Sequence, residues 1–104
     1  MLSISFDSDH EWWVSGKIFD RLFQSALDRG MSPNLEQWRD VANANGGLDL
    51  SLIEPAEADE LLAALRSTAE RELARLEATD PASEDGSYRI SLLKFMELMP
   101  KTAS

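Results

Sequence analysis

Side chains of the types that bind metal ions cluster near the N-terminus. They supply carboxylate oxygens and one imidazole within five residues: Asp7, Asp9, His10 and Glu11. A calcium loop beginning at Asp7 needs glycine at its sixth place and glutamate at its twelfth, where this chain has Trp12 and Ile18. A zinc site lacks ligands, because His10 is the only histidine and the chain has no cysteine. We therefore expect no metal site and a solvated loop before the first helix.

No catalytic motif surrounds the serines, glycines or carboxylates. Only His10 could act as an imidazole base for a serine nucleophile, and no serine lies in a GxSxG elbow. The Gly46-Gly47 pair belongs to neither of the glycine-rich phosphate-binding motifs. The 19 acidic residues give many chance carboxylate pairs, whose separation a sequence does not report. We expect no catalytic residue, no cofactor and no enzyme activity, with carboxylate-based catalysis as the weaker alternative.

The adjacent residues Trp12 and Trp13 are the most informative candidates for a binding surface. Two neighbouring indoles at the edge of a helix rarely both bury, so one is expected to stay accessible. In a purely structural interpretation, one ring packs on the following helix and the other covers the region of Trp38. In the functional interpretation, the accessible indole anchors a protein partner, since tryptophan is enriched at interface hot spots. The predicted partner-binding residues are this pair and two groups of acids: Trp12, Trp13, Asp7, Asp9, Glu11, Glu57, Asp59 and Glu60.

The second of these acidic groups lies at the start of the longest predicted helix, where Glu54 adds a further carboxylate. Anions are favoured there by the helix dipole, so the simplest interpretation is a solvated helix start. An acidic docking patch is the alternative.

The charge balance narrows the class of partner. The chain has 104 residues, of which 19 are acidic and 10 basic, and its formal net charge is -9. Direct nucleic-acid binding is disfavoured, because phosphate contacts need clusters of lysine and arginine. No run approaches the roughly eighteen apolar residues of a membrane span, so we expect a soluble cytoplasmic protein. An acidic surface favours a basic protein partner.

Four helices are predicted to form the framework. The clearest runs from Ser15 to Gly30, because apolar residues recur at helical spacing between an N-cap serine and a terminating glycine. Two more are expected from Pro33 to about Asn45, after an N-cap at Ser32, and from Pro55 to about Ala78. The last is expected from about Leu92 to Met99, with Ser91 as its N-cap.

Three short stretches alternate apolar and polar residues with the period of a half-buried strand: 2–6, 48–52 and 88–92. Residues 79–87 are predicted to form an exposed loop, and residues 101–104 a frayed tail. The predicted fold is mainly α, with about four helices in one compact domain over residues 1–104. If the alternating stretches pair, it becomes α+β with a small two- or three-stranded sheet.

These observations favour a small acidic module that binds other proteins. A narrower form is an immunity- or antitoxin-like inhibitor, which blocks a basic nucleic-acid-degrading toxin by presenting carboxylates where phosphates would sit. The alternative in a different class is a structural homo-oligomer, for example a homodimer whose aromatic surface pairs with itself through a two-fold axis.

Overall fold

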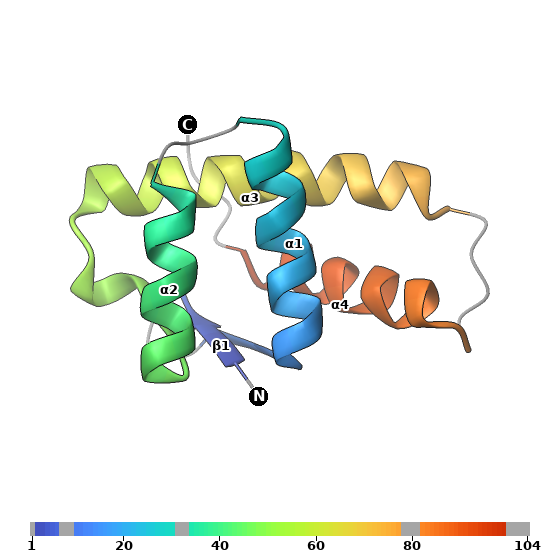
Figure 1. Ribbon diagram of the computed structural model, residues 1–104, viewed down its shortest axis with the longest axis horizontal. Coiled ribbons are helices and arrows are strands. Elements are labelled where there is room, and N and C mark those ends of the chain that lie inside the picture. The colour runs from blue at the N-terminus through green and yellow to red at the C-terminus, as the bar shows by residue number, and fades with distance from the viewer. Residues whose placement is uncertain (1, 7–9, 31–33, 78–81, 100–104) are drawn as a thin grey trace.

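The computed structural model describes residues 2–6, 10–30, 34–77 and 82–99 (Figure 1). Its elements in chain order are β1 (Leu2–Ser5), β2 (Glu11–Val14), α1 (Gly16–Asp28), α2 (Leu35–Asn45), β3 (Gly47–Asp49), the 3-10 turn η1 (Leu50–Leu52), α3 (Pro55–Arg75) and α4 (Glu84–Leu98). The four helices and the three-stranded sheet form one compact globule. The prediction of a mainly helical fold with a small sheet is therefore confirmed.

Helix α1 begins and ends where its sequence predicts. The Ile18 backbone N–H donates to Ser15 Oγ at 3.3 Å, and Gly30 has a positive φ of 64° just beyond the last turn. The centre of its apolar face is fully buried, and the rings of Phe19 and Phe23 stack with centroids 4.5 Å apart. The short helix α2 starts at Leu35, and the predicted cap and first residue, Ser32 and Pro33, lie outside the described residues.

The predicted start of α4 is wrong. The helix begins at Glu84, capped by Ser83, whose Oγ accepts a hydrogen bond from the Gly86 N–H at 3.0 Å. Residues 88–92 therefore belong to a helix rather than a strand, and residues 84–87 of the predicted loop form its first turn. The alternation of Tyr88, Ile90 and Leu92 is misleading, because Ile90 points to solvent with 53% exposure. The tail at 101–104 and residues 79–81 lie outside the described part of the chain.

The sheet has the strand order β2-β1-β3, with β1 antiparallel to β2 and parallel to β3. Two predicted stretches contribute to it: 2–6 supplies β1, whereas 48–52 is divided between β3 and η1. Strand β2 is absent from the sequence prediction, which treats residues 7–14 as a connector. That interpretation is wrong for Glu11–Val14, because these residues pair antiparallel with β1.

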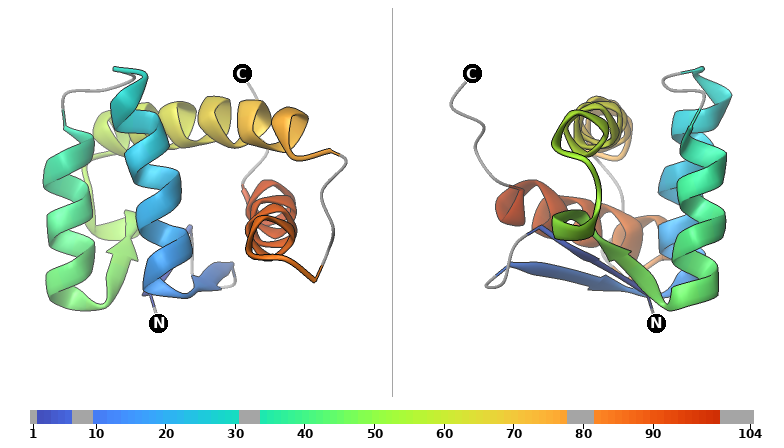
Figure 2. Two further views of the ribbon diagram at one scale, coloured as in Figure 1. Left: turned by 45° about the vertical axis from the view of Figure 1, so that its right-hand side comes forward. Right: turned by 90° about the vertical axis from the view of Figure 1, so that its left-hand side faces the viewer.

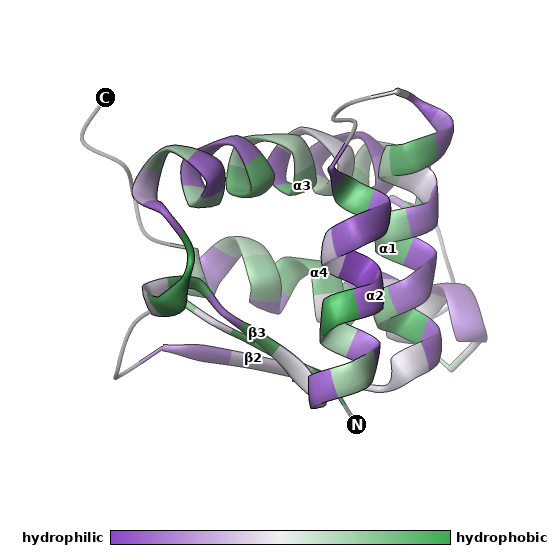
Figure 3. Cartoon of the chain, turned by 60° about the vertical axis from the view of Figure 1, so that its left-hand side comes forward, coloured by the Kyte–Doolittle hydropathy of each residue, from purple (hydrophilic) through white to green (hydrophobic). Residues whose placement is uncertain are grey.

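The strand register gives the sheet two different faces. Its inner face is apolar and buried, with Trp12, Ile4 and Leu48 in one cross-strand row. Helix α4 packs on this face and α3 on α4, while α1 and α2 run side by side at one end (Figures 2 and 3). The outer face is turned away from α4, and α2 lies along its β3 side. None of the described helices is both long enough and apolar enough to cross a membrane.

Candidate functional site

The two adjacent tryptophans have opposite environments. Trp12 is 0% exposed, its Nε1–H donates to the Ser91 carbonyl oxygen at 2.9 Å, and its ring meets Phe95 edge-on at 4.8 Å. Trp13 points to the other face of the sheet and is 56% exposed. Trp12 therefore belongs to the core, and its assignment to a partner-binding surface is wrong. Trp13 is the accessible indole.

Trp13 borders an open groove of about 610 Å³ on the outer side of the sheet. We call it the tryptophan groove. Its apolar wall is assembled from three elements, namely β2, α2 and the segment around η1: Trp13, Trp38, Val41, Leu52 and Ile53. Leu52 is 84% exposed. Large apolar side chains that line one groove and stay this exposed mark an interaction surface more often than scattered single ones do.

Small residues leave the groove open next to Trp13. Ser3 on β1 and Gly47 on β3 occupy the same cross-strand row as Trp13, and both line the groove. Gly47 has φ 153°, and a Cβ there would lie 2.5 Å from the Ser3 carbonyl oxygen. The close approach of β1 and β3 therefore requires glycine at this position.

Two carboxylates flank the groove on the neighbouring cross-strand row. Glu11 on β2 and Asp49 on β3 both pair with Ser5 of β1, so they lie two strands apart, about 10 Å between backbones. Both residues are exposed. Glu11 Oε2 accepts a hydrogen bond from the Trp13 indole at 2.8 Å, which fixes the ring's orientation. Of the acids predicted around the tryptophans, Asp7 and Asp9 lie outside the described residues.

The second predicted acidic group does not join the groove. Glu57, Asp59 and Glu60 are exposed residues near the start of α3, and none of them lines it. Glu57 lies in the first turn, where a carboxylate matches the helix dipole. The structure thus brings together Glu11 and Trp13 and separates both from the α3 acids.

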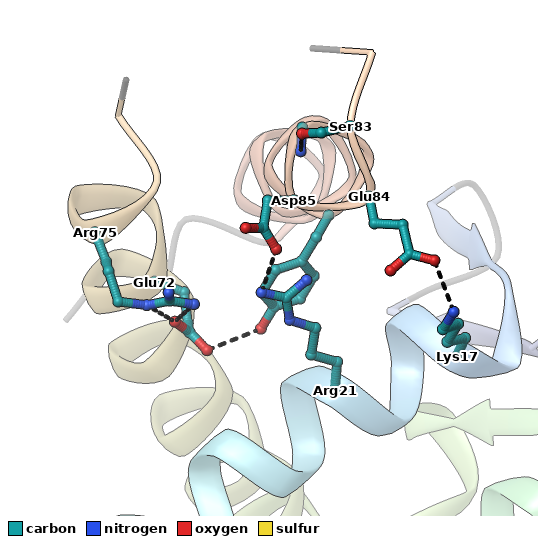
Figure 4. Close-up of polar contacts among 9 residues, drawn as sticks. Lys17, Arg21, Glu72, Arg75, Ser83, Glu84 and Asp85 are labelled. Carbon is teal, nitrogen blue, oxygen red and sulfur yellow. Dashed lines mark hydrogen bonds and ion pairs between the residues drawn. The ribbon is translucent and has the colours of Figure 1, made fainter. Parts of the chain in front are cut away.

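A polar network centred on the buried residues Glu72 and Tyr88 joins α1, α3 and α4 (Figure 4), and it was not predicted from the sequence. Glu72 is only 9% exposed, binds Arg75 at 2.9 Å and accepts a hydrogen bond from the Tyr88 hydroxyl at 3.3 Å. Arg21 lies 4.2 Å from the centre of the Tyr88 ring and pairs with Asp85 at 2.7 Å. The helical spacing of Glu72 and Arg75 was visible in the sequence, but the burial of Glu72 was not.

The electrostatics of this network favour an ionised Glu72 and a neutral Tyr88. Burial alone would raise the pKa of Glu72, but hydrogen bonds from Ser25, Arg75 and Tyr88 and the charge of Arg75 lower it below its ordinary value. Burial, followed by the neighbouring Glu72 charge, raises the pKa of Tyr88 well above its ordinary value. A carboxylate held ionised in this way does not serve as a general acid, so we assign the network a structural role.

Nearby, Lys17 pairs with Glu84 at 2.8 Å, and this interaction lowers the pKa of the Glu84 carboxyl. Both side chains are well exposed, so the pair is a weak surface contact between α1 and α4. Over the part of the chain that the structure describes, no three His, Cys, Asp or Glu side chains are grouped so as to hold a metal ion.

Comparison of the chain with models of protein families, with curated proteins and with solved structures finds no match.

Proposed function

We propose that this chain is a protein-binding module whose tryptophan groove receives a basic segment of a partner. The observation that supports this most directly is the exposure of two large apolar side chains that line the same groove, Trp13 at 56% and Leu52 at 84%. Covering a large apolar side chain contributes about 1.5 to 3 kcal/mol, so a partner that covers both gains a substantial part of a typical binding energy. The hydrogen bond to Glu11 orients the Trp13 ring before a partner binds, which lowers the entropic cost of binding.

Charge supports a basic partner rather than a neutral one. Asp49 lines the groove, Glu11 contacts the Trp13 indole at its margin, and the whole chain carries a formal net charge of -9. Lysine or arginine side chains on the partner can pair with these carboxylates while an apolar neighbour covers Trp13. Such complementarity speeds association and makes it sensitive to salt.

A narrower version of the proposal is an immunity- or antitoxin-like inhibitor. A nucleic-acid-degrading toxin has a basic substrate channel, and the Glu11 and Asp49 carboxylates would occupy positions of phosphates there. Co-expression with basic nuclease toxins tests this version: protection of the cells by the natural chain, lost in Trp13→Ser, is expected. Absence of protection across a set of such toxins would remove the inhibitor version and leave the general proposal in place.

The general proposal is tested by selecting binders from a random peptide display library at low salt. We expect enriched peptides that combine lysine or arginine with large apolar residues, and whose affinity falls as salt is added. Their binding should be strongly weakened in Trp13→Ser and less so in Leu52→Ser. Ile90→Ser is the matched control, because Ile90 is also an exposed apolar residue at 53% but lies on α4, away from the groove. Enriched peptides without basic residues, or peptides that bind Trp13→Ser as well as the natural chain, would contradict the proposal.

A further inference from the structure

The free edge of β2 is the feature from which we infer a binding mode. The Phe6 N–H donates to the His10 carbonyl oxygen at 2.9 Å, so these two residues form a hydrogen-bonded pair across the hairpin. Bonded and non-bonded pairs alternate along an antiparallel ladder. In the observed register, Trp12 and Val14 therefore direct their backbone groups toward β1. Glu11 and Trp13 direct theirs away from the sheet.

These outward backbone groups have no described partner. Strand β2 lies at the end of the order β2-β1-β3, and no described strand pairs with its outer side. Outside the ladders, no backbone hydrogen bond found among the described residues involves Glu11 or Trp13. An edge of this kind is a template for another strand.

We propose that the partner's basic segment adds to β2 as a fourth, antiparallel strand of the sheet. This inference rests on the proposed function and adds the free edge of β2 to the binding surface, which it joins at Trp13. The N–H and C=O groups of Glu11 and Trp13 would form hydrogen bonds with two residues of the partner, themselves separated by one residue. The side chains of those two residues then lie on the outer face, one beside Glu11 and the other beside Trp13.

The identity of those two partner side chains follows from the chemistry of β2. Arginine or lysine opposite Glu11 forms a cross-strand ion pair, and a β-branched residue opposite Trp13 packs on the exposed ring. In an antiparallel strand, the residue opposite Trp13 comes first, so the partner sequence reads β-branched, any residue, basic. A second copy of this chain fits less well as the added strand. Each copy carries a net charge of -9, and its β2 edge would present the carboxylate of Glu11 where a basic side chain is needed.

The probe is a capped synthetic peptide of sequence STVTRTS, in which valine and arginine match Trp13 and Glu11. Amide hydrogen exchange and amide chemical shifts of the natural chain are measured by NMR with and without the peptide. Without it, the amides of Glu11 and Trp13 should exchange fast and those of Trp12 and Val14 slowly. At saturation, exchange at Glu11 and Trp13 should slow by about tenfold or more, as it does for amides that enter a sheet.

Backbone-modified peptides and one pair of protein variants isolate the backbone contribution. N-methylation of the valine or arginine amide should abolish binding, whereas N-methylation of the threonine between them should be tolerated, because that amide points away from β2.

Trp13→Thr retains the outward N–H and Trp13→Pro lacks it, while neither change removes a bond to β1. Binding should therefore be weaker in Trp13→Pro than in Trp13→Thr. Replacing the peptide arginine by glutamate should abolish binding of the natural chain.

Three results would overturn the strand addition. The first is absence of binding by the peptide at millimolar concentration. The second is binding that shifts Trp38 and Leu52 but leaves exchange at Glu11 and Trp13 unchanged, a result that retains the proposed function and rejects the mode. The third is protection of the Glu11 and Trp13 amides that increases with protein concentration alone, which identifies a second copy as the occupant. Failure of the proposed function itself is judged separately, by the library selection.

Discussion

Trp12 and Trp13 are neighbours in the chain, yet their indoles lie on opposite sides of the sheet, one fully buried and the other 56% exposed. The reason is that strand β2 alternates its side chains between two faces. Trp12 faces α4, where Ser91 accepts its indole N–H and Phe95 meets its ring. Trp13 faces solvent beside Glu11. The same residue type is therefore part of the core at position 12 and part of the surface at position 13.

Substitution of each tryptophan in turn should show that Trp12 stabilises the fold and that Trp13 does not. Trp12→Ala is expected to lower the free energy of unfolding by about 3 to 5 kcal/mol, because it leaves a large cavity and removes the hydrogen bond to the Ser91 carbonyl oxygen. Trp13→Ala should change it by less than about 0.5 kcal/mol. Urea unfolding followed by circular dichroism measures both values. An equal loss in the two variants would show that Trp13 also supports the core.

The adjacent glycines provide a second matched pair. Gly46 ends α2 with φ 81° and has open space around its Cα, so Gly46→Ala should cost only the left-handed conformation, about 1 to 2 kcal/mol. In Gly47→Ala, the new methyl group would also collide with the Ser3 carbonyl oxygen. We expect a loss at least about 2 kcal/mol larger than in Gly46→Ala, or failure to fold. Thermal unfolding of the two variants tests this, and similar melting temperatures would exclude the close contact.

The pH dependence of stability should report the ionised state of Glu72. Its folded-state pKa is lowered from 4.5, so the carboxylate stabilises the fold above that value and the stabilisation is lost as the pH falls through the folded-state pKa. At neutral pH, Glu72→Gln should cost about 1 to 3 kcal/mol, since it weakens hydrogen bonds to Arg75 and Tyr88 in a buried position. The difference in free energy of unfolding between the natural chain and Glu72→Gln should shrink as the pH falls from about 5 to about 2.

Urea titrations at a series of acidic pH values measure this difference. The exposed pair of Arg66 and Glu70 supplies the control, because Glu70→Gln removes an ion pair of similar spacing at the surface. That variant should lose less than about 1 kcal/mol at any pH. A difference for Glu72→Gln that stays constant with pH would contradict the assignment.

Ionisation of Tyr88 should lower the stability of the fold at alkaline pH. Its folded-state pKa is raised from 10.0, chiefly by burial, so its contribution is complete below pH 10.0 and is lost as the pH rises above that value. Tyr88→Phe removes the hydroxyl and should cost about 1 kcal/mol at neutral pH. Because phenylalanine does not ionise, the variant should lose less stability than the natural chain between about pH 9 and pH 11. Equal slopes of stability against pH would show that Tyr88 ionises normally.

Local signals in the sequence were sufficient for much of the helical framework. Ser15, the apolar stripe after it and Gly30 predict α1 correctly, because a cap, a period of 3.6 and a terminating glycine all act within a few residues of one another. The same kind of signal misled at α4. The stretch from Tyr88 to Leu92 fits both a strand and a helix, and only the packing of Tyr88, Leu92 and Phe95 against the rest of the chain selects the helix.

The sequence by itself determined the composition of the candidate surface: an acidic chain, a tryptophan pair with Glu11 beside it, and no cysteine. Only the tertiary structure decided which indole is exposed, that Asp49 joins Glu11 across the sheet, and that Glu72 is buried. Strand pairing and burial depend on contacts between residues far apart in the chain, such as Trp12 with Ser91 and Glu72 with Tyr88. The outward edge of β2 likewise exists only because β1 lies on its other side, a relationship that no short stretch of sequence encodes.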